Sequence, residues 1–205
     1  MKISLDVDGV LANFTDAAWI ILRDLGHPVP PRGAEPTDWN WISWGATPDL
    51  MKKVFQVIND LPNFWTQSRP YLENVHALRN FLTYTNTSQE VFFTTARALT
   101  RGLPVAVQTR AWLEKYDIWT PRNTFRNHLT ILHVEKTASK AVLFQALGIT
   151  HSVDDHGPTV MECEAVPGHT AVLLDRPWNQ EYQPKHRVKS LADFFAIVYA
   201  EGKNG

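Results

Sequence analysis

The sequence predicts an α/β protein: a Rossmann-like parallel sheet flanked by helices, with a small, mainly helical segment inserted after the first strand. Three observations support this prediction. The chain opens on an apolar strand that ends in carboxylates, a segment rich in proline and tryptophan follows, and strands then alternate with helices. Such alternation is typical of parallel βαβ units, and 205 residues are enough for one core with a modest insertion.

Residues 2–10 are the first predicted strand, because apolar side chains alternate there with Ser4, Asp6 and Asp8. Gly9 follows these acids and permits a tight turn. The two-residue period of a strand places Asp6 and Asp8 on one face, where two carboxylates repel each other unless a cation or a proton separates their charges. Spacing alone leaves two interpretations open, a metal or phosphate site and a solvated strand end.

The segment after this strand is interpreted as two helices around a long loop. Residues 15–25 have the pattern of a helix, with Asn13 or Thr15 as its N-cap. Residues 27–48 contain five prolines and three tryptophans, a composition typical of irregular structure. Thr47 is then expected to cap the second helix, which has a proline in its first turn.

From residue 73 onward, helices and strands alternate. Helices are predicted over residues 73–84, 103–116, 138–147, 158–164 and 190–200, and strands over residues 89–95, 129–134, 149–155 and 169–175. The carboxyl ends of parallel strands meet at one edge of a sheet, where α/β proteins bind ligands. That edge is expected to gather the acids of the first strand and the following polar residues: Thr94, Thr95, Glu135, Lys136, Asp154 and Asp155.

Composition argues against several classes of protein. The formal net charge of −1 gives no overall field that would recruit nucleic acid or an anionic membrane. No apolar run approaches the length of a membrane-spanning helix, and no secretory leader is recognisable. The single cysteine, Cys163, cannot form an internal disulfide and is interpreted as a small core residue. We therefore expect a cytoplasmic protein.

Four motifs at the predicted strand ends resemble those of the haloacid dehalogenase superfamily of phosphatases: DVDGVL, VFFTTAR, HVEKTASK and SVDDHG. The stretches DVDGVLANF, TTAR, AWLEKY, LHVEKT and VDDHGP are similar to the 5'(3')-deoxyribonucleotidase family, and RPWN is similar to a late loop of its bacterial and phage members. The resemblance implies a core domain of residues 1–14 and 71–205 and a cap subdomain of residues 15–70.

The resemblance also implies roles for the four acids. Asp6 would attack phosphorus, and Asp8 would protonate the leaving oxygen and later activate water. Mg²⁺ would be the cofactor, held by the Asp6 carboxylate, the backbone carbonyl of Asp8 and Asp154, with Asp155 as a direct or indirect ligand. An all-oxygen set of this kind suits a small, hard cation.

The second and third motifs supply hydroxyls and a lysine. Thr94 corresponds to the terminal hydroxyl residue of the second motif, and Thr95 is expected to offer its hydroxyl and backbone N–H to the phosphate. The motif lysine is either Lys136 or Lys140. We favour Lys136, because a charge at a rigid strand end is held more firmly than one on a solvated helix face.

Substrate contacts are expected from the cap and from the loop after the second motif. Phe14 matches a family aromatic that packs against the nucleobase, and Phe64 and Trp65 fall where another aromatic is expected. Arg97 is placed to reach phosphate or base. Three tryptophans of the cap either complete a stacking pocket or form the core of the cap: Trp39, Trp41 and Trp44.

The sequence thus predicts a Mg²⁺-dependent phosphatase that hydrolyses (deoxy)ribonucleoside monophosphates through an aspartyl-phosphate, with a small-molecule nucleotide as its partner. One alternative is a 3'-phosphatase acting on nucleic-acid ends, suggested by Arg101 and Arg110, although the near-neutral charge argues against a polymer. Another is a non-catalytic nucleotide-binding module. A homodimer is left open.

Overall fold

The computed structural model describes residues 1–84, 89–135 and 138–202. Its centre is a six-stranded sheet in the order β5-β4-β1-β6-β7-β8, in which every neighbouring pair is parallel. The strands are β1 (Lys2–Asp6), β4 (Glu90–Thr95), β5 (His128–His133), β6 (His151–Asp154), β7 (Thr170–Leu174) and β8 (Arg187–Val188). This arrangement confirms the predicted Rossmann-like α/β fold class.

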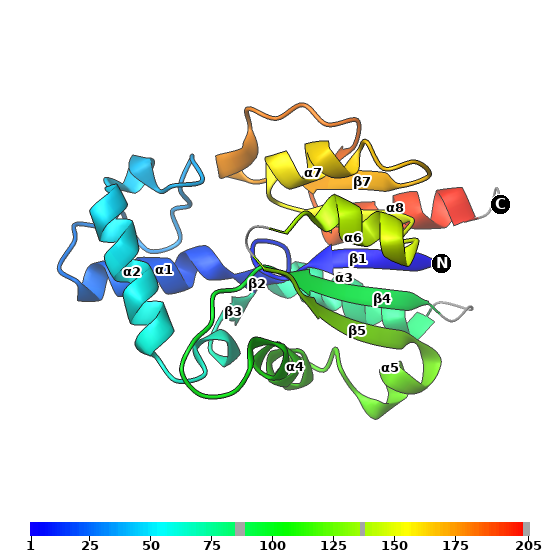
Figure 1. Cartoon of the computed structure of the whole chain (residues 1–205), viewed down its shortest axis with the longest axis horizontal. Helices are drawn as coiled ribbons and strands as arrows, with labels where there is room; N and C mark the ends of the chain where they lie inside the picture. The colour runs from blue at the N-terminus through cyan, green and yellow to red at the C-terminus, as the bar shows by residue number, and fades with distance from the viewer. Residues whose placement is uncertain (85–88, 136–137, 203–205) are drawn as a thin grey trace.

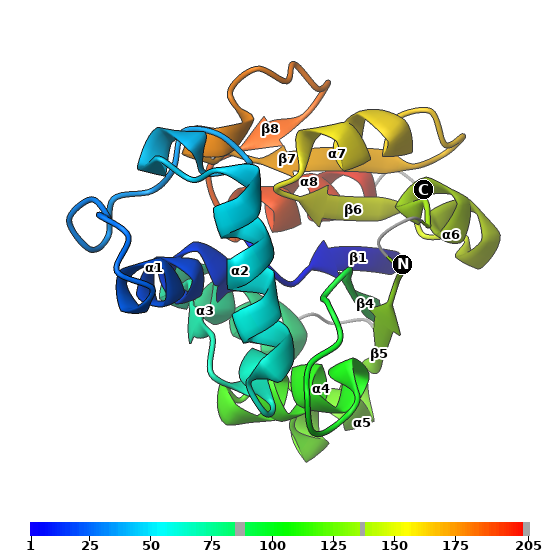
Figure 2. The ribbon, with the colours of Figure 1, turned by 60° about the vertical axis from the view of Figure 1, so that its left-hand side comes forward.

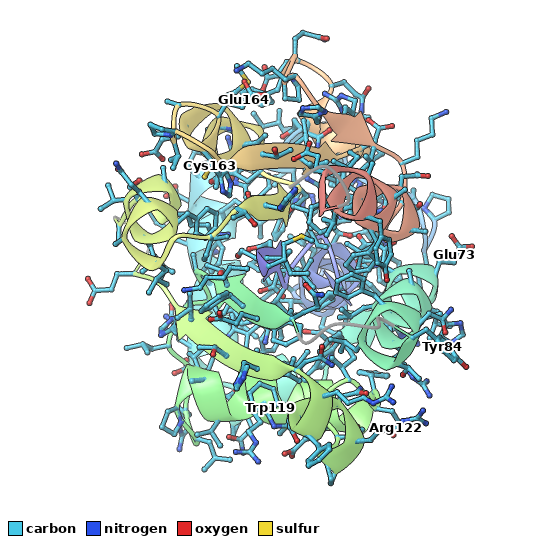
Figure 3. All side chains as sticks on the ribbon, turned by 90° about the vertical axis from the view of Figure 1, so that its right-hand side faces the viewer. Glu73, Tyr84, Trp119, Arg122, Cys163 and Glu164 are labelled. Atoms are coloured by element: carbon cyan, nitrogen blue, oxygen red, sulfur yellow. The ribbon has the colours of Figure 1, made fainter. Side chains whose placement is uncertain are left out.

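Helices cover both faces of the sheet. Figure 3, viewed from the end at which the strands begin, shows α3 (Leu72–Tyr84) and α8 (Leu191–Gly202) on one side and α6 (Lys140–Leu147) and α7 (Gly157–Cys163) on the other. The larger apolar cluster joins one face of the sheet to α3, α8 and α4 (Val105–Lys115). A smaller cluster joins the opposite face to α6 and α7. With both faces covered, the central strands β1, β4 and β6 are buried except for the first residue of β1 and of β4.

The insertion after β1 lies beyond the carboxyl ends of the strands. It contains α1 (Phe14–Asp24), α2 (Pro48–Asp60) and two short 3₁₀ helices, Ile42–Trp44 and Phe64–Thr66. Figures 1 and 2 show α1 and α2 standing at that end of the sheet. Their apolar residues form a cluster separate from the two clusters of the sheet. The predicted cap boundaries at residues 15 and 70 stay predictions.

Two short strands connect the insertion to the core. β2 (Ala12–Asn13) precedes α1, and β3 (Arg69–Pro70) precedes α3; the two pair in antiparallel orientation. The chain therefore enters and leaves the insertion at adjacent points. Asn13 is the N-cap of α1, where its side chain accepts a hydrogen bond from the Asp16 N–H.

Several boundaries differ from the sequence-based prediction. β1 ends at Asp6 and not near residue 10, because the backbone turns back: the Leu11 and Ala12 N–H groups both donate to the Val7 carbonyl. The short elements α5 (Pro121–Arg126), β2, β3 and β8 were not predicted. Strands of two residues carry too little pattern to be detected from sequence. Among the described residues, no helix is long and apolar enough to cross a membrane.

Candidate active site

Asp6 is the last residue of β1 and lies at the centre of the sheet. It stands beside Thr94 of β4 in the strand register, and its side chain is largely buried. The Nζ atom of Lys140 lies 2.5 Å from Asp6 Oδ1 and 2.7 Å from Asp154 Oδ2. One ammonium group therefore joins two carboxylates that come from neighbouring strands.

Lys140 reaches this position from the first turn of α6, whose N-cap is Ser139. The expectation that a lysine at this position stays on a solvated helix face is wrong, because Lys140 is 9% exposed. The favoured candidate, Lys136, lies outside the described residues. Lys140 is thus the lysine that the described part of the chain brings to the acids.

Three carboxylates form a compact group at this edge. Asp6, Asp154 and Asp155 each offer one oxygen, and these oxygens lie within 4.8 Å of one another. All three side chains are buried. The Asp8 carboxylate does not belong to this group. The resemblance implied only its backbone carbonyl, and not its side chain, as a metal ligand.

Crowding and burial change the protonation of these groups. Burial raises the pKa of Asp6 well above its usual value; Lys140 opposes the rise, and the charges of the neighbouring aspartates add to it. Burial and the charge of Asp154 raise the pKa of Asp155 to about 7. Burial alone would lower the pKa of Lys140, but the attraction of Asp154 and Asp6 outweighs it, so its pKa is raised and it stays charged.

The carboxylate group fits a divalent cation. Its donors are oxygens only, and they are close enough to share one ion. Asp6, Asp154 and Asp155 are the residues that would hold Mg²⁺. The His156 N–H donates to Asp154 Oδ1 at 2.9 Å and fixes that carboxylate from the other side.

The loop after β7 orients Asp155. Trp178 Nε1 donates to Asp155 Oδ2 at 2.9 Å, and Asn179 Nδ2 donates to the Asp155 carbonyl at 2.9 Å. Gly9 passes close to the same carboxylate with φ of 80°, and a Cβ atom at Gly9 would lie 2.1 Å from Asp155 Oδ2. The motifs DVDG and RPWN are therefore adjacent in space, which their resemblance to family motifs did not reveal.

Asp8 lies beside the carboxylate group with different partners. Both of its oxygens accept hydrogen bonds from Arg97, Nε to Oδ2 at 2.7 Å and Nη2 to Oδ1 at 2.9 Å. The Thr95 hydroxyl also donates to Asp8 Oδ2, at 3.3 Å. The hydroxyl of Thr94 instead shares a hydrogen bond of 2.7 Å with Ser4 Oγ, and Thr94 is fully buried. Of the two threonines, Thr95 is the one in contact with a site acid.

Aromatic side chains of the insertion gather around Phe14, the first residue of α1. Its ring centroid lies 5.6 Å from that of Trp65, 5.7 Å from Trp41 and 6.4 Å from Phe55. The Phe64 and Trp65 rings pack edge to face, with 4.9 Å between their centroids. Phe64 also lines a surface groove between α1 and α2. Phe14, Phe64 and Trp65 are therefore brought together, and Phe55 is a member that the sequence did not single out.

The three tryptophans predicted for the cap divide into two groups. Trp41 and Trp44 are buried in the apolar cluster of the insertion. Trp39 is half exposed, and its ring lies 4.4 Å from that of His156, directly after the metal-site acids. Trp39 thus connects the insertion to the acidic edge of the sheet.

Comparison with known proteins supports the fold. No family model and no curated protein matches the chain. Among solved structures, the chain is similar to a HAD (haloacid dehalogenase) superfamily hydrolase, subfamily IA, variant 1, from Geobacter sulfurreducens, with a TM-score of 0.52 at 14% identity. The match covers 96% of this chain and 98% of that one. The chain therefore has the fold of a HAD-superfamily hydrolase over nearly its whole length.

Proposed function

We propose that this chain is a Mg²⁺-dependent phosphatase that hydrolyses nucleoside monophosphates, in particular deoxyribonucleotides, through an aspartyl-phosphate on Asp6. The observation that carries the proposal is the environment of Asp6. Asp6 is the last residue of the central strand, and its carboxylate contacts the buried ammonium group of Lys140. It also lies close to two further buried carboxylates, those of Asp154 and Asp155. The likeness to a hydrolase of the HAD superfamily supports the same class of reaction.

The proposed reaction has two steps. Asp6 attacks phosphorus, the bond from phosphorus to the ester oxygen breaks, and Asp8 gives its proton to that oxygen. A water molecule then attacks phosphorus, Asp8 takes the water proton, and the bond to Asp6 breaks to release inorganic phosphate. Splitting one difficult displacement in this way lowers the barrier, and a positioned acid and base contribute about 10²–10⁴-fold.

The remaining polar groups would hold the phosphoryl group and its charge. Lys140 offers a fixed positive charge beside the nucleophile. Thr95 is placed to offer its hydroxyl beside Asp8, whereas the bond from Thr94 to Ser4 favours a structural role for Thr94. Mg²⁺ held by Asp6, Asp154 and Asp155 would neutralise phosphate charge and favour ionised Asp6.

The aromatic cluster supports a nucleoside as the leaving group. Phe14 belongs to the insertion that stands over the carboxyl ends of the strands, and its partly exposed ring offers a stacking surface for a base, whereas Trp65 is buried against that ring. In this proposal residues 15–70 act as a cap over a small-molecule substrate. The cytoplasmic location and the homodimer stay predictions.

A phosphate-release screen tests the proposal. We expect turnover of nucleoside 5'- or 3'-monophosphates in Mg²⁺, loss of activity in EDTA, and recovery when Mg²⁺ is restored. Asp6→Asn should abolish release while the protein stays folded, and Asp49→Asn, which changes an exposed carboxylate on α2, should leave turnover unchanged. Turnover that survives in Asp6→Asn would rule out the covalent mechanism, and full activity in EDTA would rule out the metal.

The same screen tests the two alternative functions, a nucleic-acid 3'-phosphatase and a non-catalytic nucleotide-binding module. A 3'-phosphorylated oligonucleotide that reacts faster than any mononucleotide would favour the nucleic-acid 3'-phosphatase. Arg110, one basis for that alternative, already pairs with Glu114 at 2.9 Å. Nucleotide binding with no phosphate release from any monoester would identify a non-catalytic module.

A further inference from the structure

Arg97 and Asp8 form a two-point contact beside the proposed nucleophile. Nε and Nη2 of Arg97 donate to different oxygens of the Asp8 carboxylate, at 2.7 and 2.9 Å. This side-by-side geometry fixes the plane of the carboxylate as well as its position. The Arg97 side chain is completely buried, whereas the Asp8 side chain is 21% exposed. The acid therefore faces the open part of the site, with the arginine behind it.

Other contacts hold the guanidinium group in place. Nη1 of Arg97 donates to the hydroxyl of Thr109 on α4 at 3.0 Å, and Thr109 is fully buried. The ring of Trp65 lies 4.8 Å from Arg97 Cζ, while Trp65 Nε1 donates to the Ala98 carbonyl at 2.9 Å. His133 forms a hydrogen bond of 2.8 Å with the Arg97 carbonyl. Arg97 is thus fixed by β5, by α4 and by the cap region, and these contacts do not depend on substrate.

The hydrogen bonds also distinguish the two oxygens of Asp8. Among the described residues, Oδ2 accepts from both Arg97 and Thr95, whereas Oδ1 accepts from Arg97 alone. A carboxylate oxygen has two lone-pair directions. As far as the described residues go, Oδ1 consequently keeps one direction free for a proton.

We infer that Arg97 is a positioning residue that acts through Asp8: it holds the carboxylate so that Oδ1 exchanges the proton with the ester oxygen and later with water. This inference rests on the proposed function and departs from the expectation that Arg97 binds phosphate or base directly. The two N–H groups of the charged Arg97 guanidinium stabilise the carboxylate that remains after Asp8 has donated its proton. Arg97 therefore favours breaking the ester bond.

The inference predicts that the effect of Arg97 depends on the leaving group. A nucleoside alkoxide needs a proton to leave, whereas p-nitrophenolate leaves without one. The constant kcat/KM covers the steps only up to formation of the phosphoenzyme, so it isolates proton donation from the later attack of water. Arg97→Gln should lower kcat/KM for the nucleoside monophosphate at least about tenfold more than for p-nitrophenyl phosphate.

A phosphate-binding role gives a different result. Both substrates carry the same phosphate, so direct binding by Arg97 would cause equal losses on the two, and equal losses would overturn the inference. Arg97→Lys keeps the positive charge but cannot make the two-point hydrogen bond to the Asp8 carboxylate. We expect it to show the same leaving-group dependence as Arg97→Gln. Arg122→Gln removes an exposed arginine of α5 and should leave both rates unchanged.

A double-mutant cycle tests whether Arg97 acts through Asp8. In the Asp8→Asn background, Arg97→Gln should cause less than about a twofold further loss on the nucleotide, because the proton donor is already gone. A further tenfold loss would mean that Arg97 acts independently, and would also overturn the inference. If Arg97→Gln does not fold, Thr109→Val removes only the contact to Nη1 and should give a smaller loss with the same dependence on the leaving group.

The experiment separates this inference from the proposed function. A wild-type protein that hydrolyses alkyl and aryl phosphates but no nucleotide would refute the nucleotide substrate. The comparison of glycerol phosphate with p-nitrophenyl phosphate would then still test Arg97. A wild-type protein that hydrolyses no phosphate monoester would refute both.

Discussion

Replacing Lys140 by Met should destabilise the metal-free protein strongly, because it keeps the length of the side chain and removes its charge. Lys140 is the ammonium partner of Asp6 and Asp154, and the three side chains are only 7–10% exposed. Removing one partner of a buried ion pair costs about 3–5 kcal/mol. For a chain of this size each kcal/mol corresponds to about 2–4 °C, so the melting temperature should fall by about 6–20 °C.

Thermal melts of wild type and Lys140→Met in EDTA and in Mg²⁺ measure this effect. Excess Mg²⁺ should recover part of the loss, because a cation among the carboxylates replaces the missing charge and binds only the folded state. Lys52→Met is the matched control, since Lys52 pairs with Asp49 on the surface with both side chains at least 80% exposed. Exposed pairs contribute about 0–1 kcal/mol. Equal melting temperatures for Lys140→Met and wild type in EDTA would refute the reasoning.

Three further predictions concern the surroundings of the site. Gly9→Ala should raise the dissociation constant for Mg²⁺ in a calorimetric titration, because its Cβ would meet the Asp155 carboxylate at 2.1 Å. Gly26→Ala is the control: Gly26 has a similar φ of 76° but open space around it, so the dissociation constant should not change. Trp178→Phe removes the indole N–H from that carboxylate and should weaken Mg²⁺ binding about tenfold, so an unchanged constant would contradict its orienting role. Burial lowers the pKa of His169 below 6.5, so the folded state prefers the neutral ring and loses stability as the pH falls below 6.5. In urea unfolding, the free energy of unfolding should therefore differ less between pH 7.5 and pH 5 for His169→Asn than for wild type.

The choice between two lysines shows where sequence reasoning reached its limit. Lys136 and Lys140 are four residues apart, and either fits a motif that asks for a lysine after a strand. Lys136 is the better candidate only if the first turn of the next helix faces solvent. In the structure α6 packs against the sheet from its first residue, so Lys140 points between Asp6 and Asp154. Whether a helix start faces solvent depends on how the helix docks, which no local pattern encodes.

The partners of Arg97 and Thr94 show the same limit. Sequence placed Arg97 after the second motif but could not identify its acceptor, because Asp8 is 89 residues away along the chain. It also treated Thr94 as the catalytic hydroxyl, whereas that hydroxyl shares a hydrogen bond with Ser4, although Thr94 pairs with Asp6 in the strand register. Successive side chains of a strand point to opposite faces, so Thr94 and Thr95 have different partners, Ser4 and Asp8.

By itself, the sequence determined the class of fold and the edge of the sheet at which the site lies. Alternating strands and helices require parallel βαβ units, and parallel strands bring their carboxyl ends, with Asp6, Asp154 and Asp155, to one edge. Only the tertiary structure decided which groups touch: Lys140 with two acids, Arg97 with Asp8, and Trp178 with Asp155. The physical reason is range, because periodicity and turn signals act over a few residues, whereas these contacts depend on strand register and helix docking between segments far apart in the chain.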